Sequence, residues 1–393
     1  MATRDRQRVR FATASPLRSE LRSQVTGYFR ENGLTPHATW GFYAKAAAVL
    51  ATAVALYAVF LMIPLSGMTL LAVAACFGLA QTGIAFNTQH DGSHGAVSQY
   101  KGVNRAFAAS LDLLGMSSYY WHWKHGVFHH THPNVSQYDG DVEAGPLARL
   151  APWQPARRLH RFQRFYLWAL YPWLSIKWEF WDDPVAFLSG RLEGRRVPRP
   201  RGQELAIFLG GKIGFVLWSL ALPLAIYEPG TVLAFFLISQ ATGSLASSTI
   251  FQLAHCVEEA EWCVPPAGEA PLELDWASHQ IATAVDFPVS NRLLRGLLGG
   301  LDRQTVHHLF PQVCHVHYPA LSRIVSEVCA RHGVRHRSHA GLWGALRSHD
   351  SWLDRMGRPT HERAQLADDT CRSFTPASRK RSSEVSPSGY SVL

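Results

Sequence analysis

The sequence lacks several features that would place it in a common soluble class. Its six cysteines form no Cys-x-x-Cys pair, so we expect reduced thiols rather than a disulfide framework. The first forty residues are polar and show no apolar core followed by a small-residue cleavage site, so no secretory signal is expected. The Glu-x-x-His repeat of soluble di-iron bundles is missing. Charge is scarce as well, because only 17% of the 393 residues are charged.

The apolar residues are concentrated in four nearly uncharged runs. A run of about 20 such residues spans a hydrocarbon core of about 30 Å. A Pro-Leu-Ser-Gly break separates the first two runs and Tyr-Glu-Pro-Gly separates the last two, which indicates two tight hairpins of membrane helices. Lys212 lies inside the third run, where it either snorkels to an interface or faces the protein interior. The predicted spans are residues 44–65, 68–86, 205–226 and 231–253.

The distribution of basic residues predicts how the chain is oriented in the membrane. The two hairpin turns, 64–67 and 227–230, contain no Lys or Arg, whereas nearly all arginines lie in the N-terminal segment, in 87–204 and in the C-terminal third. The positive-inside rule places these three regions, and therefore both termini, in the cytoplasm. The net charge of +9 is then explained by topology and by contact with the membrane surface, so we expect no nucleic-acid partner.

Three segments follow from this pattern. Residues 1–43 form a cytosolic N-terminal segment, in which Leu17, Leu21 and Val25 share one face of an amphipathic helix predicted over 16–31. Residues 44–345 form the membrane domain. Residues 346–393 form a C-terminal segment that is rich in Ser, Pro, Arg and Lys and is expected to be disordered from about 368.

Histidine is unusually dense in WHWKHGVFHHTHPN, residues 121–134, and two similar groups occur elsewhere. HDGSH follows the second apolar run, QTVHHLFP lies in the C-terminal third, and a single histidine ends the fourth run. On an α-helix, residues four apart share a face, while His130 would point about 100° away from His129 and could serve a second metal. The predicted topology puts all eight at one membrane face: His90, His94, His125, His129, His130, His255, His307 and His308.

The number of imidazoles limits the choice of metal. A zinc site takes three or four protein ligands, so eight histidines exceed one site and suit two metals with four or five ligands each. Hard cations such as magnesium and calcium prefer oxygen ligands. Iron is favoured over copper and zinc, although spacing alone does not separate them. The predicted fold is therefore an all-α integral membrane protein in which four transmembrane helices, in two hairpins, carry a cytosolic helical cap that holds a di-metal site.

Polar and aromatic residues near the histidines are further candidates. One set could orient the imidazole N–H groups or could equally be solvated loop residues: Asp91, Asn134, Asp139, Asp141, Asp302 and Gln304. A second set could line a substrate channel near the head-group region, although interfacial anchoring explains its tryptophans equally well: Trp121, Trp123 and Lys124.

The three histidine groups give the sequence a clear resemblance. From about residue 40 to 345 it resembles the membrane fatty acid desaturases, through HDGSH at 90–94, KHGVFHHTHPN at 124–134 and GGLDRQTVHHLFP at 299–311. The glutamine that leads the third group, followed by Leu-Phe-Pro, is similar to the front-end branch. Enzymes of that branch insert a double bond between an existing one and the carboxyl end of the chain.

The resemblance implies a chemistry and its residues. Seven of the eight histidines would bind two irons, His255 matches an additional histidine of the family, and Gln304 stands where other branches have a histidine. The substrates would be O₂ and a fatty acyl chain, carried as acyl-CoA or as an acyl-lipid. Because no His-Pro-Gly-Gly haem motif of a fused cytochrome b5 occurs, we expect a separate donor, either cytochrome b5 or ferredoxin with its reductase. Val306 and Asp286 depart from the pattern, where Glu and Asn are common.

Other functions remain open at this point. The same centre could hydroxylate or epoxidise the chain, because a small change in C–H orientation redirects the oxidant. A membrane zinc hydrolase would need only three or four of the histidines. A metal transporter or b-type haem protein would place its ligands within the bilayer, where these runs have essentially none. The topology fits an endoplasmic reticulum membrane in a eukaryote or an inner membrane in a bacterium.

Overall fold

The structure is a computed structural model, and it describes residues 10–13, 15–143, 145–265, 272 and 274–358. Helices dominate this part of the chain, in agreement with the predicted all-α fold. Its one sheet is a two-stranded antiparallel hairpin of β1 (Arg191–Leu192) and β2 (Arg195–Arg196). The tail that the sequence predicts to be disordered lies outside the described residues.

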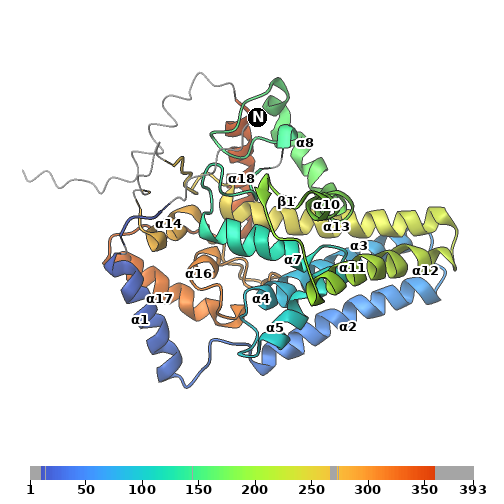
Figure 1. The fold of residues 1–393 in the computed structure, drawn as a ribbon, viewed down its shortest axis with the longest axis horizontal. Helices are drawn as coiled ribbons and strands as arrows, with labels where there is room; N and C mark the ends of the chain where they lie inside the picture. Colours follow the sequence, from blue (N-terminus) through green and yellow to red (C-terminus); the bar gives the residue numbers. More distant parts are fainter. Residues whose placement is uncertain (1–9, 14, 144, 266–271, 273, 359–393) are drawn as a thin grey trace, which may run out of the picture.

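Four helical segments are long and apolar enough to cross a membrane, and each overlaps one predicted run. In Figure 1 they run side by side toward one end of the molecule, paired as two hairpins. The segments are Trp40–Met62, Gly67–Ser93, Gln203–Leu224 and Pro229–His255. They comprise α2 (Trp40–Met62), α3 (Gly67–Ile84), η1 (Ala85–Gln89), α4 (His90–Ser93), α11 (Gln203–Val216), η7 (Leu217–Ala221), α12 (Leu222–Leu224) and α13 (Pro229–His255).

Helices α3 and α13 pack closely because small residues meet where they cross. A Cβ added to Gly78 would lie 2.2 Å from the Ser239 carbonyl oxygen, and one added to Gly243 would lie 2.9 Å from the Gly78 oxygen. The Thr82 hydroxyl donates across the same contact to the Gly243 carbonyl at 3.1 Å. Small residues with a bridging hydroxyl are the usual way for membrane helices to approach closely. This crossing fixes the second and fourth spans, at whose ends the candidate ligands lie.

A helical cap covers the opposite end of the bundle (Figure 1). In its core, Leu17, Leu21 and Val25 of the first helix pack against Leu321 and Val325. The amphipathic face predicted over 16–31 is thus buried on the cap. The cap comprises α1 (Pro16–Glu31), α14 (Trp276–Thr283), α15 (Arg292–Leu297), α16 (Gln304–Leu309), η8 (His315–His317), α17 (Tyr318–Arg331) and α18 (Leu342–Gly357).

Short helices connect the bundle to the cap. Their aromatic-rich part is broken into brief turns and leaves Phe165 at 71% and Trp181 at 65% exposed, which is typical of an element in the membrane interface. These helices are α5 (Lys101–Ala108), α6 (Ser110–Leu113), α7 (Ser118–Trp121), η2 (His122–His129), η3 (Gly145–Leu147), η4 (Arg158–Phe162), α8 (Gln163–Leu170), η5 (Tyr171–Trp173), α9 (Leu174–Lys177), η6 (Trp178–Asp182) and α10 (Asp183–Ser189).

Lys212, the one charged residue in the interior of the third run, faces the protein. Its ammonium group donates at 2.8 Å both to the Glu179 carbonyl oxygen and to the carboxylate of Asp183, whose side chain is fully buried. Asp183 also accepts from the Ser117 amide and from the Trp178 indole. This ion pair therefore joins α11 to the connecting helices, and the Asp183 charge is fully buried.

We predict that Lys212→Met destabilises the protein by about 3–5 kcal/mol, because it leaves the buried Asp183 charge without a partner. Thermal unfolding in detergent, followed by size-exclusion chromatography, measures the loss. The double variant Lys212→Met, Asp183→Asn should recover a large part of it. As a control, Lys177→Ala removes the partner of Asp182 in an exposed pair and should cost below about 1 kcal/mol. Equal losses for the two lysine variants would contradict the buried role.

His349 ties α18 to α13 and to the connecting helices. Its Nδ1 donates to the Cys256 carbonyl at 2.7 Å, so the neutral ring accepts at Nε2 from the Tyr171 hydroxyl at 2.9 Å. Burial lowers the pKa of His349 to about 4. An unfolded histidine has a pKa of about 6.5. Between these values the unfolded chain binds more protons than the folded protein, so the His349 contribution to stability is lost as the pH falls through this window.

We predict that His349→Gln flattens the pH dependence of stability. On lowering the pH from 7 to 5, the wild type should lose about 2 kcal/mol that the variant does not lose, since glutamine does not titrate. Thermal unfolding at both pH values checks the difference. Parallel curves for the two proteins would show that His349 is not held neutral by the fold.

Candidate metal centre

The eight candidate histidines come from four parts of the fold and meet at the junction of bundle and cap. One pair continues the second span through a π-helical turn, one histidine ends α13, two lie on α16, and three belong to η2 and the residue after it. Seven are buried and His94 is half-buried. The histidines are His90, His94, His125, His129, His130, His255, His307 and His308.

The imidazole nitrogens form two sets with a shared region between them. In the first set, one ring nitrogen from each member lies within 4.8 Å of the others: His90, His94, His125 and His307. The second set meets the same limit: His129, His255 and His308. His130 lies between them, since it forms a third such set with His307 and His308. Nitrogen atoms that converge in this way can hold metal ions at two neighbouring positions.

The backbone around the second histidine group is a π-helix, whereas the sequence analysis assumed an α-helix. In a π-helix the hydrogen bonds join residues i and i+5, so residues five apart approach one another. The Nε2 atoms of His125 and His130 are accordingly 3.2 Å apart. His130 therefore does not point away from the first set, and all three histidines of this segment face the same interior. Single π-turns are often found at functional sites.

Carboxylates hold two of the rings from outside. The Nδ1 atom of His129 lies 3.1 Å from both carboxylate oxygens of Asp139, and Nδ1 of His125 lies 3.4 Å from Asp141. Burial lowers the pKa of His125 to about 4, against smaller opposing effects that include Asp141. Each ring therefore keeps its Nε2 directed toward the interior. This is the usual arrangement behind a metal-bound histidine.

Neutral groups hold three more rings. His255 donates from Nδ1 to the Thr283 carbonyl at 2.9 Å, and His308 donates from Nδ1 to the Gln280 side-chain oxygen at 3.0 Å. The Nδ1 atom of His307 lies 3.3 Å from the hydroxyl oxygen of Tyr318. The Nε2 atoms of His308 and His255 then approach within 3.1 Å. These contacts fix the tautomers that leave Nε2 free for a metal.

Several buried imidazole nitrogens have no hydrogen-bond partner among the described residues. They include both ring nitrogens of His90 and the Nε2 atoms of His94 and His307. Leaving a buried polar atom unpaired costs about 1–3 kcal/mol. Burial also lowers the pKa of His130, His307 and His308 well below the usual range, so these rings are neutral. Neutral, converging and unpaired nitrogens fit a pair of borderline metal ions such as iron.

The eight histidines together form a cage of imidazole rings. Asp91 lies beside this cage and belongs to a chain of hydrogen bonds outside it. Its carboxylate is 3.9 Å from Nδ1 of His90 and accepts from Nδ1 of His315 at 2.9 Å. The other nitrogen of His315 accepts from the ammonium group of Lys45 at 2.6 Å. A chain of three polar groups thus connects the first membrane helix to the residue that follows a candidate ligand.

The other polar candidates hold backbone near the cage rather than ligand rings. Asn134 donates to the carbonyls of His255 and Glu261, Asp302 accepts from the Val289 amide, and Gln304 donates to the Leu301 carbonyl. The residue Asp286, where Asn is common, accepts from the Thr305 amide at 2.9 Å and so holds the start of α16. Val306, where Glu is common, is buried in the cap core.

The three channel candidates have different surroundings. Trp121 stacks on the ring of His125 at 4.4 Å and contacts Trp178 at 5.4 Å, so it forms a wall of the cage. Trp123 packs beside Phe128, away from these contacts. Lys124 forms an ion pair with Asp141 at 3.0 Å and another with Glu193. The ammonium group of Lys124 therefore steadies a carboxylate that contacts His125.

Three groups that orient candidate ligand rings have no signal in the histidine-rich stretches of the sequence. Gln280, the Thr283 carbonyl and Tyr318 lie outside the histidine groups, and Gln280 is 28 positions from the ring that it holds. A backbone carbonyl has no residue signature. The sequence contains no periodic signal that joins Gln280 to His308, because the cap fold brings α14 to α16.

Comparison with known proteins identifies the family. A family model described as fatty acid desaturase matches residues 66–340. The chain is 32% identical over 350 residues to an sn-1 linoleoyl-lipid 6-desaturase of Arthrospira platensis, covering 89% of this chain and 95% of the relative. A Synechocystis protein with the same name is 31% identical, covering 90% and 98%. An acyl-lipid (8-3)-desaturase of Physcomitrium patens is 33% identical, covering 86% and 71%.

We predict that Asp139→Asn lowers the metal affinity of the cage by about 10- to 100-fold, because His129 loses its charged outer partner. Metal content after dialysis against increasing chelator concentrations measures this. Asp302→Asn is the matched control, since Asp302 is also buried but holds the Val289 amide instead of a ligand ring. Equal metal retention in both variants would contradict the role of Asp139.

Proposed function

The chain belongs to the fatty acid desaturase family, and from this premise we propose that it is an O₂-dependent front-end desaturase of acyl-lipids that uses two irons. The observation that carries the proposal is the convergence of eight buried imidazoles, with unpaired nitrogens, at the cap end of the membrane helices. The names of the relatives, which include 6-desaturases of linoleoyl-lipid and an (8-3)-desaturase of acyl-lipid, support the front-end position and the lipid-bound substrate.

The two sets of nitrogens support one set of ligands for each iron. One iron would be held by His90, His94, His125 and His307, and the other by His129, His255 and His308. His130 contacts both sets and would complete the cage. When bound, the irons would supply the capacity to activate O₂ and to oxidise an unactivated C–H bond.

The protein residues hold the cage and shape its surroundings. Asp139, Gln280 and the Thr283 carbonyl fix the imidazole rings, so little reorganisation is needed when metal binds. Trp121 closes one side of the cage with an apolar face, which excludes water beside His125. The position of the new double bond then depends on which carbons of the bound chain reach the cage, at the ångström scale.

The stoichiometry requires an electron donor. Removing two hydrogens from adjacent methylenes and reducing O₂ to two water molecules consumes two further electrons and two protons. We propose that a separate protein supplies these electrons, either cytochrome b5 or ferredoxin with its reductase. Because basic residues are scarce in the hairpin turns, we also propose that the chain crosses the membrane four times with the cage on the cytosolic side.

We predict that cells expressing the protein gain a fatty acid with a double bond between an existing one and the carboxyl end. Gas chromatography with mass spectrometry, after each double bond is located chemically, detects it. His129→Ala should reduce the product at least about 100-fold, because it removes a ligand. His332→Ala is the matched control and should retain it, since this ring contacts Glu20 at the cap surface.

The product distinguishes the competing reactions. A hydroxyl or epoxide at the same position, also lost in His129→Ala, would contradict desaturation and assign the cage to a hydroxylase or epoxygenase. A zinc hydrolase needs only three or four of the histidines, so a hydrolytic activity that survives replacement of half of them would favour that function instead.

A further inference from the structure

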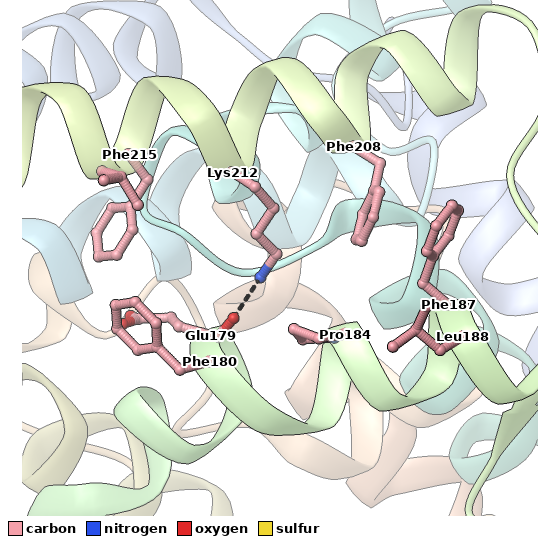
Figure 2. A pocket seen from close by; sticks show the side chains of 9 residues that line it. Glu179, Phe180, Pro184, Phe187, Leu188, Phe208, Lys212 and Phe215 are labelled. Atoms are coloured by element: carbon pink, nitrogen blue, oxygen red, sulfur yellow. Dashed lines mark hydrogen bonds between the residues drawn. The ribbon is translucent and has the colours of Figure 1, made fainter.

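A cleft of about 340 Å³ lies between α10 and α11, outside the metal cage. Figure 2 shows phenylalanine rings of α11 facing those of α10 and of the preceding turn η6 across the cleft. Its apolar lining comprises Phe180, Phe187, Leu188, Phe208, Phe215 and Val216. A concave apolar surface of this size takes a hydrocarbon rather than a polar ligand.

The polar groups of the cleft carry no charge that a ligand must neutralise. The ammonium group of Lys212 is already held by the Gly115 and Glu179 carbonyls and by the Asp183 carboxylate. Glu179 is only 3% exposed, and burial raises its pKa well above the usual range, against smaller effects of Lys212 and Gln240. Burial therefore disfavours a negative charge on this carboxyl group. An uncharged ligand suits this lining.

The cleft faces the bilayer. Its α11 wall belongs to the candidate span Gln203–Leu224. Two apolar side chains at its rim, Leu188 and Val216, are 73% and 42% exposed. In a membrane protein such side chains meet acyl chains, so a lipid in the bilayer reaches the cleft without crossing water.

Two indoles in tilted contact link the segment beside the cleft to the cage. Trp178, next to Glu179, contacts Trp121 at 5.4 Å between ring centroids, and Trp121 stacks on His125 at 4.4 Å. The cleft is therefore only a few side chains from a candidate ligand, and Trp178 and Trp121 are among those side chains. A chain in the cleft is not the chain whose carbons meet the cage.

From this arrangement, and resting on the proposed function, we propose that the cleft holds the second, non-reacting acyl chain of a two-chain glycerolipid substrate. The two chains of such a lipid are joined through one glycerol, so when one chain lies at the cage the other must lie close by. The uncharged, lipid-facing cleft between α10 and α11 offers that position. The protein would thereby select acyl-lipids with two chains over substrates with one.

Binding of two probes to the purified full-length protein tests the proposal. The probes are dilinoleoyl phosphatidylglycerol and its one-chain lyso form, and native mass spectrometry measures their affinities. Val216→Trp fills the cleft and should lower the affinity for the two-chain probe about tenfold, which corresponds to the loss of about two buried methylenes. The same variant should lower the affinity for the one-chain probe by less than about twofold. Leu188→Trp is a second filling variant in case the first fails to fold. Ile213→Trp, which is 61% exposed on the same helix outside the cleft, should change neither affinity.

Two results would overturn the proposal: equal weakening of both probes in the filled variants, or a wild type that binds the two-chain probe no more tightly than the one-chain probe. Binding is measured without turnover, so its outcome is separate from that of the product analysis. If the protein forms the predicted double bond but fails the binding test, the proposed function stands and the proposed role of the cleft is rejected.

Discussion

Eight imidazoles can share one buried volume only if most of them remain uncharged and their bare nitrogens meet a common partner. Each additional positive charge would be repelled by its neighbours and penalised by burial, which is why the pKa values of His130, His307 and His308 are lowered so strongly. Hydrogen bonds from outside use one nitrogen of several rings and leave the other facing inward. A bound metal would satisfy the remaining nitrogens.

The membrane helices place these candidate ligands by extending beyond their apolar cores. The second span continues through a π-turn to His90, and the fourth ends at His255. The close crossing at Gly78 and Gly243 fixes these two extensions relative to each other. The cap then adds α16 from the opposite side. Ligands from the bundle and from the cap therefore meet only when both parts have folded, so the stability of the cage depends on the whole domain.

Much of this arrangement follows from the sequence, because its signals are local. Apolar runs predict the four spans, the spacing of Leu17, Leu21 and Val25 predicts α1, and the resemblance to a known family marks the histidine groups. The π-helix at His125 was not predictable, since an α-helix and a π-helix share the same residue pattern. The outer hydrogen bonds of His255 and His308 depend on how α14 packs, and a backbone carbonyl such as that of Thr283 leaves no trace in the sequence. The sequence allows Lys212 to face either the interface or the interior, and its ion pair with the buried Asp183 places it toward the interior.

The central claim is that this cage holds two irons, and counting metals tests it most directly. The full-length protein, purified in detergent from iron-replete cells, would be analysed for iron, zinc and copper against protein concentration. The account predicts two irons per chain and negligible zinc and copper. One zinc per chain with no iron would contradict it, and would remove the chemistry on which the proposed desaturation depends.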